Sequence, residues 1–119
     1  METSQQQRES LRLQLGNQHD YQFVLLDEKG HQQCEFCVCI DISAVGAQFV
    51  LNRDISVNTR LVLNVIRHDI LIETLPVTVL RGNTELNDEE RYYCSVRFDK
   101  AFVSYPRIVE ELTGSSIAA

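Results

Sequence analysis

The sequence predicts an all-β protein, a small antiparallel barrel of about six strands with a short helix near its C-terminus. The clearest evidence is Arg91–Phe98, where apolar and polar residues alternate with a period of two, as in a half-buried strand. Several other short segments are rich in β-branched and aromatic residues and are separated by residues typical of turns. Ser104–Thr113 differs from these, because its apolar residues recur at helical spacing.

The first half of the chain predicts a hairpin and one further strand. Tyr21–Leu26 is a strongly apolar run, and Arg12–Leu15 is a candidate for its beginning. Asp27–Gly30 has the composition of a turn. Gln33–Ile40 is therefore predicted to return as the hairpin partner of the first strand, and Ala47–Leu51 to follow as a short strand.

The second half predicts another hairpin. Thr59–Arg67 and Ile70–Leu80 are apolar segments joined by the short His68–Asp69 connection. Pro76 lies inside the second segment, and its missing amide hydrogen indicates an edge position or a bulge. Gly82–Glu90 is rich in acidic residues and asparagine and is interpreted as a solvated loop.

The C-terminal helix has recognisable ends. Ser104 is a candidate cap, Pro106 falls in the first turn and Gly114 follows the last turn. An apolar stripe is formed by Ile108, Val109 and Leu112. Because a helix of this length is not stable alone, we expect it to pack on the sheet and cover an open end of the barrel.

The chain of 119 residues is expected to form a single domain. Residues 1–12 form a polar segment that we expect to be flexible, residues 13–114 form the barrel with its helix, and residues 115–119 form a tail. No apolar run approaches the length of a membrane span, and Met1–Gln7 is too polar for a signal peptide. The expectation is a cytoplasmic protein without membrane insertion.

The net charge of −6 argues against broad binding to nucleic acid or to an anionic membrane surface. An anionic ligand must therefore be attracted by a local group of basic side chains. No arrangement typical of a catalytic triad, a phosphate-binding glycine loop or a metalloprotease can be placed in the sequence. We accordingly expect a protein that is not an enzyme.

The four cysteines include one CxxC pair, Cys34 and Cys37. Because Glu35–Ile40 is predicted to be a strand, the two side chains are expected on opposite faces, which is poor geometry for chelation. No second CxxC follows, and the histidines lack zinc-binding spacing relative to the cysteines. Structural thiols are favoured over a metal or redox site.

Two short patterns point to ligand binding. Asp41 and Ser43 lie two residues apart, where an extended chain points both side chains the same way, and Gly46 supplies a position without a Cβ. Arg8 and Arg12 place two guanidinium groups four residues apart near the N-terminus. Guanidinium forks together with a carboxylate and a hydroxyl are groups that hold phosphates and purine edges.

The two patterns together resemble the signature of the PilZ family, bacterial receptors for cyclic di-GMP. Arg8 and Arg12 match the family's RxxxR segment, and Asp41, Ser43 and Gly46 match its [D/N]xSxxG segment. Tyr92–Phe98 is similar to the family's last barrel strand, and a short helix follows it. The resemblance covers nearly the whole chain in order and implies a split six-stranded barrel.

The resemblance also implies a function and a set of roles. Cyclic di-GMP would be the ligand, with no cofactor, and an unidentified downstream protein would receive the signal. Arg8 and Arg12 would fold over the barrel and hold phosphates and the O6/N7 edge of guanine. Asp41 and Ser43 would contact a guanine, whereas Gly46 would serve the backbone.

Two alternatives stay open for these residues. Asp41 and Ser43 are also common turn residues that bond to nearby amides, and Arg8 and Arg12 are also plausible solvated charges. Arg97, on the polar face of its strand, either lines the ligand surface or is solvated, and solvation is favoured. At the level of function, the alternative is a PilZ-like adaptor that binds no nucleotide and acts through protein contacts alone.

Overall fold

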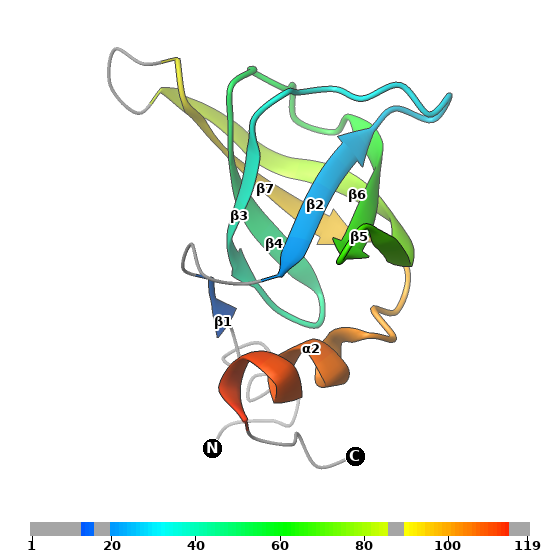
Figure 1. The fold of residues 1–119 in the computed structure, drawn as a ribbon. Coiled ribbons are helices and arrows are strands. Elements are labelled where there is room, and N and C mark those ends of the chain that lie inside the picture. The colour runs from blue at the N-terminus through cyan, green and yellow to red at the C-terminus, as the bar shows by residue number, and fades with distance from the viewer. Residues whose placement is uncertain (1–12, 16–19, 86–89, 115–119) are drawn as a thin grey trace, which may run out of the picture.

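The computed structural model describes residues 13–15, 20–85 and 90–114 of the chain. Within them the backbone forms strands and one C-terminal helix, and the predicted all-β class is confirmed (Figure 1). The elements are β1 (Leu13–Gln14), β2 (Tyr21–Leu26), β3 (Cys37–Ile42), β4 (Gly46–Leu51), β5 (Arg60–Arg67), β6 (Ile70–Glu85), β7 (Tyr92–Phe98) and α2 (Tyr105–Thr113).

The strands form one antiparallel sheet with the order β1-β3-β4-β7-β6-β5-β2. The sheet curls until β2, at one end of this order, faces β3 near the other end (Figure 1). Among the described residues these two segments share one isolated bridge, between Leu26 and Gln32, which precedes β3. The result is a barrel that is split along the β2–β3 seam.

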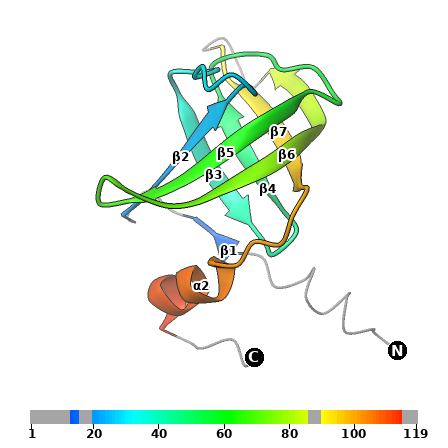
Figure 2. The ribbon, with the colours of Figure 1, turned by 90° about the vertical axis from the view of Figure 1, so that its right-hand side faces the viewer.

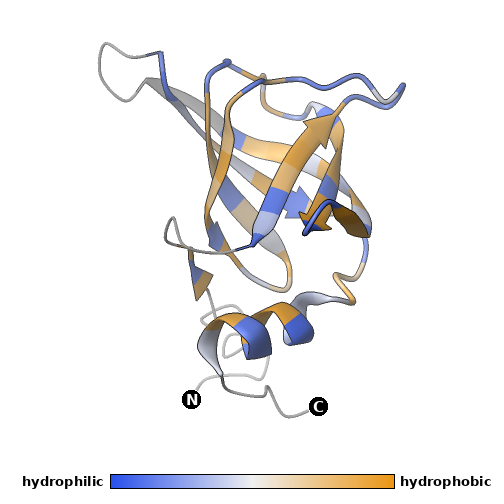
Figure 3. Ribbon diagram, viewed as in Figure 1, coloured by the Kyte–Doolittle hydropathy of each residue, from blue (hydrophilic) through white to orange (hydrophobic). Residues whose placement is uncertain are grey.

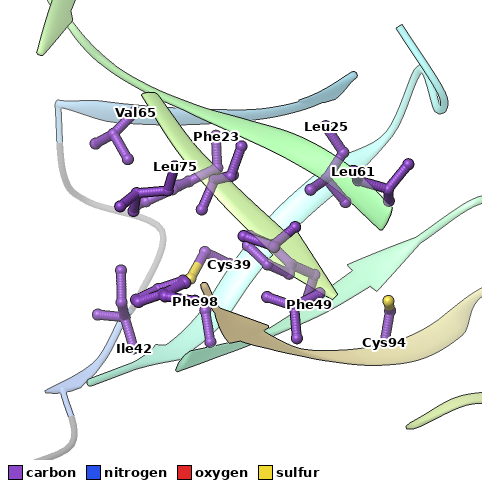
Figure 4. Packing of buried hydrophobic residues seen from close by; sticks show 14 of the residues in the cluster. Phe23, Leu25, Cys39, Ile42, Phe49, Leu61, Val65, Leu75, Cys94 and Phe98 are labelled. Carbon is purple, nitrogen blue, oxygen red and sulfur yellow. The ribbon is translucent and has the colours of Figure 1, made fainter. Parts of the chain in front are cut away.

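The core lies inside this curled sheet. Alternate side chains of β2, β4, β5 and β7 are buried, which explains the period-two pattern of the sequence. Apolar and polar residues are accordingly interspersed along the strands (Figure 3). Phe23 and Phe49 meet edge to face across the interior, with ring centroids 6.1 Å apart. Other strand residues that fill the interior are Leu25, Cys39, Ile42, Leu61, Val65, Leu75, Cys94 and Phe98 (Figure 4).

The predicted first hairpin is wrong. β2 pairs with β5 through the register Tyr21–Arg67 to Leu26–Val62, and β3 pairs with β1 and β4. The turn itself forms as expected, because the Asp27 carboxylate accepts hydrogen bonds from the backbone N–H groups of Lys29 and His31. After the turn, pairing with β2 is limited to the Leu26–Gln32 bridge and the Gln33 amide, which donates to the Leu25 carbonyl at 2.9 Å, and from Cys37 the chain pairs with β4. A turn of the right composition therefore did not determine which strands pair.

The second hairpin is confirmed, with a longer second strand than predicted. His68 and Asp69 both have positive φ, 50° and 63°, as a tight two-residue hairpin turn requires. β6 continues to Glu85, so the expected loop at Gly82–Glu90 is wrong for its first four residues, and residues 86–89 lie outside the described residues. Bulges in the β6–β7 pairing accompany this extension.

Pro76 lies in the central strand β6, at a position just beyond the end of the neighbouring strand β7. β6 pairs with β7 from Val77 onward and with β5 on its other side. The Pro76 carbonyl accepts a hydrogen bond from the Asp99 amide, just past the end of β7. The missing N–H of Pro76 faces that same side, so the proline removes no bond from the β6–β7 ladder.

Helix α2 covers one end of the barrel, close to β1 (Figures 1 and 2). Its predicted apolar stripe is confirmed, since Ile108 and Val109 are buried and Leu112 packs against the core. Gly114 ends the helix in the left-handed conformation, with φ of 72°. Ser104 makes no side-chain cap bond, and the Glu73 carboxylate on β6 accepts from the Ser104 amide instead, at 2.8 Å.

Candidate functional site

The turn between β3 and β4 is closed by Ser43. Its hydroxyl accepts hydrogen bonds from the amides of Val45 and Gly46, at 3.3 and 3.2 Å, and donates to the Gly46 carbonyl at 3.2 Å. The Ser43 amide donates to the same carbonyl at 2.9 Å. The side chain is fully buried. Ser43 therefore holds the shape of this turn from within.

Gly46 begins β4 where two backbones meet closely. A Cβ at this position would lie 2.5 Å from the carbonyl oxygen of Val96 on β7. The glycine is thus required by the close approach of β4 to β7, and its backbone has no positive φ. This agrees with the expectation that Gly46 is a requirement of the backbone.

Asp41 is turned to the outside of the barrel by an irregularity in β3. The pairing of β3 with β4 shifts register between Cys39 and Asp41. As a result Cys39 and Ile42, three residues apart, are both fully buried, whereas Asp41 between them is half-exposed. Strict alternation would have put Asp41 on the same face as Cys39. In an uninterrupted strand the side chains of Asp41 and Ser43 would point the same way. Here Asp41 faces outward, whereas Ser43 is buried.

A row of polar side chains crosses five strands at the level of Asp41. In the strand register Gln14 on β1 is opposite Asp41, Asp41 is opposite Gln48 on β4, Gln48 is opposite Ser95 on β7, and Ser95 is opposite Arg81 on β6. All five are exposed or half-exposed. A cleft of about 510 Å³ is lined by the last four of them. We call these five residues the polar row.

The polar row combines the groups needed to bind a charged heterocycle. Its carboxylate accepts hydrogen bonds, its two amides accept and donate, and the guanidinium of Arg81 adds positive charge. Such a set can recognise the edge of a base together with an anion. The binding role of Asp41, Ser43 and Gly46 stays a prediction, and Arg8 and Arg12 lie outside the described residues.

Gln48 and Arg81 were not found by sequence reasoning. Neither belongs to a motif, and they are separated from Asp41 by seven and forty positions. They share the cleft because β4, β7 and β6 follow β3 in the sheet order. The signal that would have found them is the strand register, which the sequence does not show directly.

A second cleft of about 590 Å³ lies on another part of the barrel and includes Arg60 and Arg97. Arg97 is exposed and its Nε atom lies 3.0 Å from Oδ1 of Asp99. The Thr78 hydroxyl donates to Asp99 at 2.6 Å, and this bond, with Arg97, lowers the pKa of Asp99 below its ordinary value. Arg97 is thus exposed on the wall of this cleft and paired with a carboxylate, and the choice between a solvated and a ligand-lining role stays a prediction.

Two features bear on other classes of function. Among residues 13–15, 20–85 and 90–114, no group of three or more His, Cys, Asp or Glu side chains is arranged to hold a metal ion. The one helix in that part of the chain is too short and too polar to cross a membrane.

Comparison with protein-family models and with curated proteins found no match. Comparison with solved structures found the K. pneumonia MrkH–cyclic di-GMP complex, with a TM-score of 0.58 and 21% sequence identity. The likeness is one of fold. It covers 85% of this chain and 48% of the MrkH chain, so this chain spans about half the length of MrkH. The shared fold agrees with the PilZ-like all-β architecture that the sequence motifs imply.

Proposed function

We propose that this chain is a cyclic di-GMP-binding receptor or adaptor domain that relays ligand binding to another protein. One observation carries the proposal. β1 begins at the residue after Arg12, and it pairs with β3 through Leu13–Ile42 and Gln14–Asp41. The strand that follows Arg12 in the sequence is thereby paired with the strand that carries Asp41, which supports the proposal that the two halves of the signature act together. The MrkH structure, which has a similar fold, is a cyclic di-GMP complex.

The proposed roles follow from the chemistry of the side chains. Arg8 and Arg12 bind the phosphates and the O6/N7 edge of a guanine, while Asp41 accepts hydrogen bonds from the guanine ring N–H and exocyclic amine. Ser43 and Gly46 act indirectly, by fixing the turn that presents Asp41. Arg81 adds a positive charge to a protein whose net charge of −6 would otherwise repel the ligand.

Ordering of the arginine segment is the proposed signal. Fixing a flexible residue costs on the order of 1–2 kcal/mol, so several charge-assisted hydrogen bonds are needed to offset the loss of chain entropy. Loss of either arginine should therefore be costly. In this role the chain binds and relays and performs no chemistry on its ligand.

The decisive experiment is a titration of the purified chain with cyclic di-GMP and, separately, with cyclic di-AMP, read by thermal shift and calorimetry. Ligand that binds only the native state must raise the melting temperature. We expect Arg8→Ala and Arg12→Ala to weaken binding and to flatten its salt dependence. Arg60→Ala, a change of the same type in the second cleft, should bind like the parent.

Asp41→Ala should behave differently from the arginine variants. We expect this substitution to weaken binding by about 1–3 kcal/mol, because a hydrogen-bond acceptor is lost. The salt dependence of binding should change little, because the substitution removes no positive charge. The preference for guanine over adenine should also fall, since a site built on hydrogen bonds discriminates through them. Unchanged binding in Asp41→Ala would make Asp41 a turn residue only. Loss of binding in Arg60→Ala alone would place the ligand in the second cleft.

A second candidate function is a PilZ-like adaptor without nucleotide binding. The observation that favours it is an apolar hairpin tip, where Ile70 is 66% exposed and Leu71 is 54% exposed. The β5–β6 hairpin projects from the barrel (Figure 2). Exposed apolar side chains at such a tip are suited to protein contacts. Absence of any thermal shift with cyclic di-GMP in the parent chain would favour this function over the first.

A further inference from the structure

The CxxC segment lies at the split of the barrel and is held by side chains from the loop after β4. The Asn52 amide donates to the Phe36 carbonyl at 3.3 Å, and the Phe36 amide donates back to Oδ1 of Asn52 at 3.2 Å. Arg53 donates to the carbonyl and side-chain oxygens of Gln33 at 3.0 and 3.1 Å. Arg91 stacks 4.1 Å from the centre of the Phe36 ring. The segment is therefore held in one conformation.

This conformation places the two thiols on one cavity, whereas an extended strand was expected to put them on opposite faces. The chain bends at Glu35, and β3 starts only at Cys37. The two residues lie on either side of this bend, and both line the same cavity between β2 and β3. Two thiols three residues apart across a bend can approach to the bond length of about 2 Å found in disulfides.

Small molecules can reach this pair from two sides. A cavity of about 440 Å³ between β2 and β3 is lined by Cys34 and Cys37. A second cavity, of about 510 Å³, is lined by Cys34 and Arg53. The guanidinium of Arg53 is fixed beside Cys34 by its bonds to Gln33, so a negative charge on the sulfur would be stabilised there.

The four thiols differ in acidity in the way a reactive pair requires. The neighbouring Cys37 thiol, followed by the charge of Arg53, lowers the pKa of Cys34. The neighbouring Cys34 thiol and burial raise the pKa of Cys37, and burial raises the pKa of Cys39 and Cys94 to about 12 and about 11. Cys34 is the thiol that ionises first and acts as the nucleophile.

We propose that Cys34 and Cys37 are a redox-active pair that hydroperoxides oxidise to an intramolecular disulfide. The Cys34 thiolate attacks one peroxide oxygen, the O–O bond breaks, and the leaving alkoxide or hydroxide takes a proton, which leaves a sulfenic acid on Cys34. Sγ of Cys37 then attacks Sγ of Cys34, and water leaves as the S–S bond forms. The two sulfurs lose two electrons and the hydroperoxide gains them. The proposal is independent of nucleotide binding.

The test uses the reduced full-length chain, treated with hydrogen peroxide, denatured, alkylated with N-ethylmaleimide and weighed by mass spectrometry. We expect the parent to keep two of its four alkylatable thiols, and the peptide containing both Cys34 and Cys37 to be lighter by two hydrogens. Dithiothreitol should restore all four. Cys94→Ala, which changes a buried thiol elsewhere in the core, should still form the disulfide.

Two further variants assign the roles of the two sulfurs. Cys37→Ser should stop at the sulfenic acid, which dimedone labels at Cys34, whereas Cys34→Ser should give no dimedone adduct at Cys37. The proposal is overturned if the parent keeps four alkylatable thiols under peroxide that oxidises a free thiol, or if the disulfide maps to another pair. The parent measurement decides the matter even if a variant fails to fold.

Discussion

Residue-scale differences separate the three members of the DxSxxG pattern. Ser43 is buried with its hydroxyl bonded to the turn, Gly46 lies against the carbonyl of Val96, and Asp41 alone borders a cleft. The pattern thus contains two residues that build a turn and one that the turn presents. Substitutions at the first two should act on stability, and those at Asp41 on binding.

Gly46→Ala tests this separation. We expect the added methyl group to destabilise the protein by about 1–3 kcal/mol, as overpacking does, because the atom in its way belongs to the β7 backbone and cannot turn aside. Val45→Ala, at an exposed position in the same turn, should change the free energy of unfolding by less than about 0.5 kcal/mol. Urea unfolding of both variants measures the difference in the free energy of unfolding. Equal values for the two variants would show that β4 and β7 can move apart at no cost in stability.

At the scale of elements, helix α2 is attached to the strands by polar contacts as well as by its apolar face. The Tyr105 hydroxyl donates to the Ile42 carbonyl at the end of β3, at 3.3 Å. The Tyr21 hydroxyl on β2 donates to the Glu111 carboxylate, which also lies 3.1 Å from Nε of Arg67 on β5. Burial and the bond to Glu111 raise the pKa of Tyr21 to about 12, so its hydroxyl remains a donor at neutral pH.

This attachment predicts a pH dependence of stability. The hydrogen bond from Tyr21, then the charges of Arg67 and Arg107, lower the pKa of Glu111 below its ordinary value of 4.5. A lowered pKa means that the ionised carboxylate stabilises the fold above pH 4.5, and that this contribution is lost as the pH falls through the folded-state pKa. Glu111→Gln should therefore be less stable than the parent at about pH 7, and the gap should narrow at about pH 3.

The measurement is urea unfolding at the two pH values. Glu110→Gln, the same change at a neighbouring exposed position, is the matched control and should differ little from the parent at either pH. A gap between Glu111→Gln and the parent that is the same at both pH values would contradict the role given to this carboxylate.

For the whole molecule, the sheet order decides where the functional groups lie. β1, β3 and β4 are consecutive at one side of the order, and β2 closes the other side. The polar row therefore begins at the strand that follows the arginine segment, while the CxxC segment lies at the split between β2 and β3. One curled sheet thus carries both proposed sites, which differ in chemistry.

Hydrogen exchange tests the proposed ordering of the arginine segment. On addition of cyclic di-GMP, we expect the amides of Arg8–Arg12 to exchange more slowly, because the arginines become bound to phosphates above the polar row. Amides of the His68–Asp69 turn, at the projecting β5–β6 hairpin, should exchange at the same rate with and without ligand (Figure 2). Equal exchange rates at Arg8–Arg12 with and without ligand would contradict the proposed ordering of the arginine segment.

The sequence by itself determined the local features of this protein. Alternation in Arg91–Phe98 marked a strand with Cys94, Val96 and Phe98 inside, and the spacing of Ile108 and Val109 marked the helix. These features are encoded in consecutive residues, because burial of alternate or every third and fourth side chain leaves a periodic pattern. For the same reason the turn at Asp27–Gly30 and the motif residues could be read without a structure.

The tertiary structure alone decided the pairing of strands and the positions of the side chains that depend on this pairing. β2 pairs with β5 rather than with β3, a bulge turns Asp41 outward, and the bend at Glu35 puts Cys34 and Cys37 on one cavity. Each depends on contacts between residues distant in the sequence, and a period-two pattern is the same whichever partner a strand has. Gln48 and Arg81 join Asp41 in one cleft for this reason, since only the packed sheet brings their strands into register.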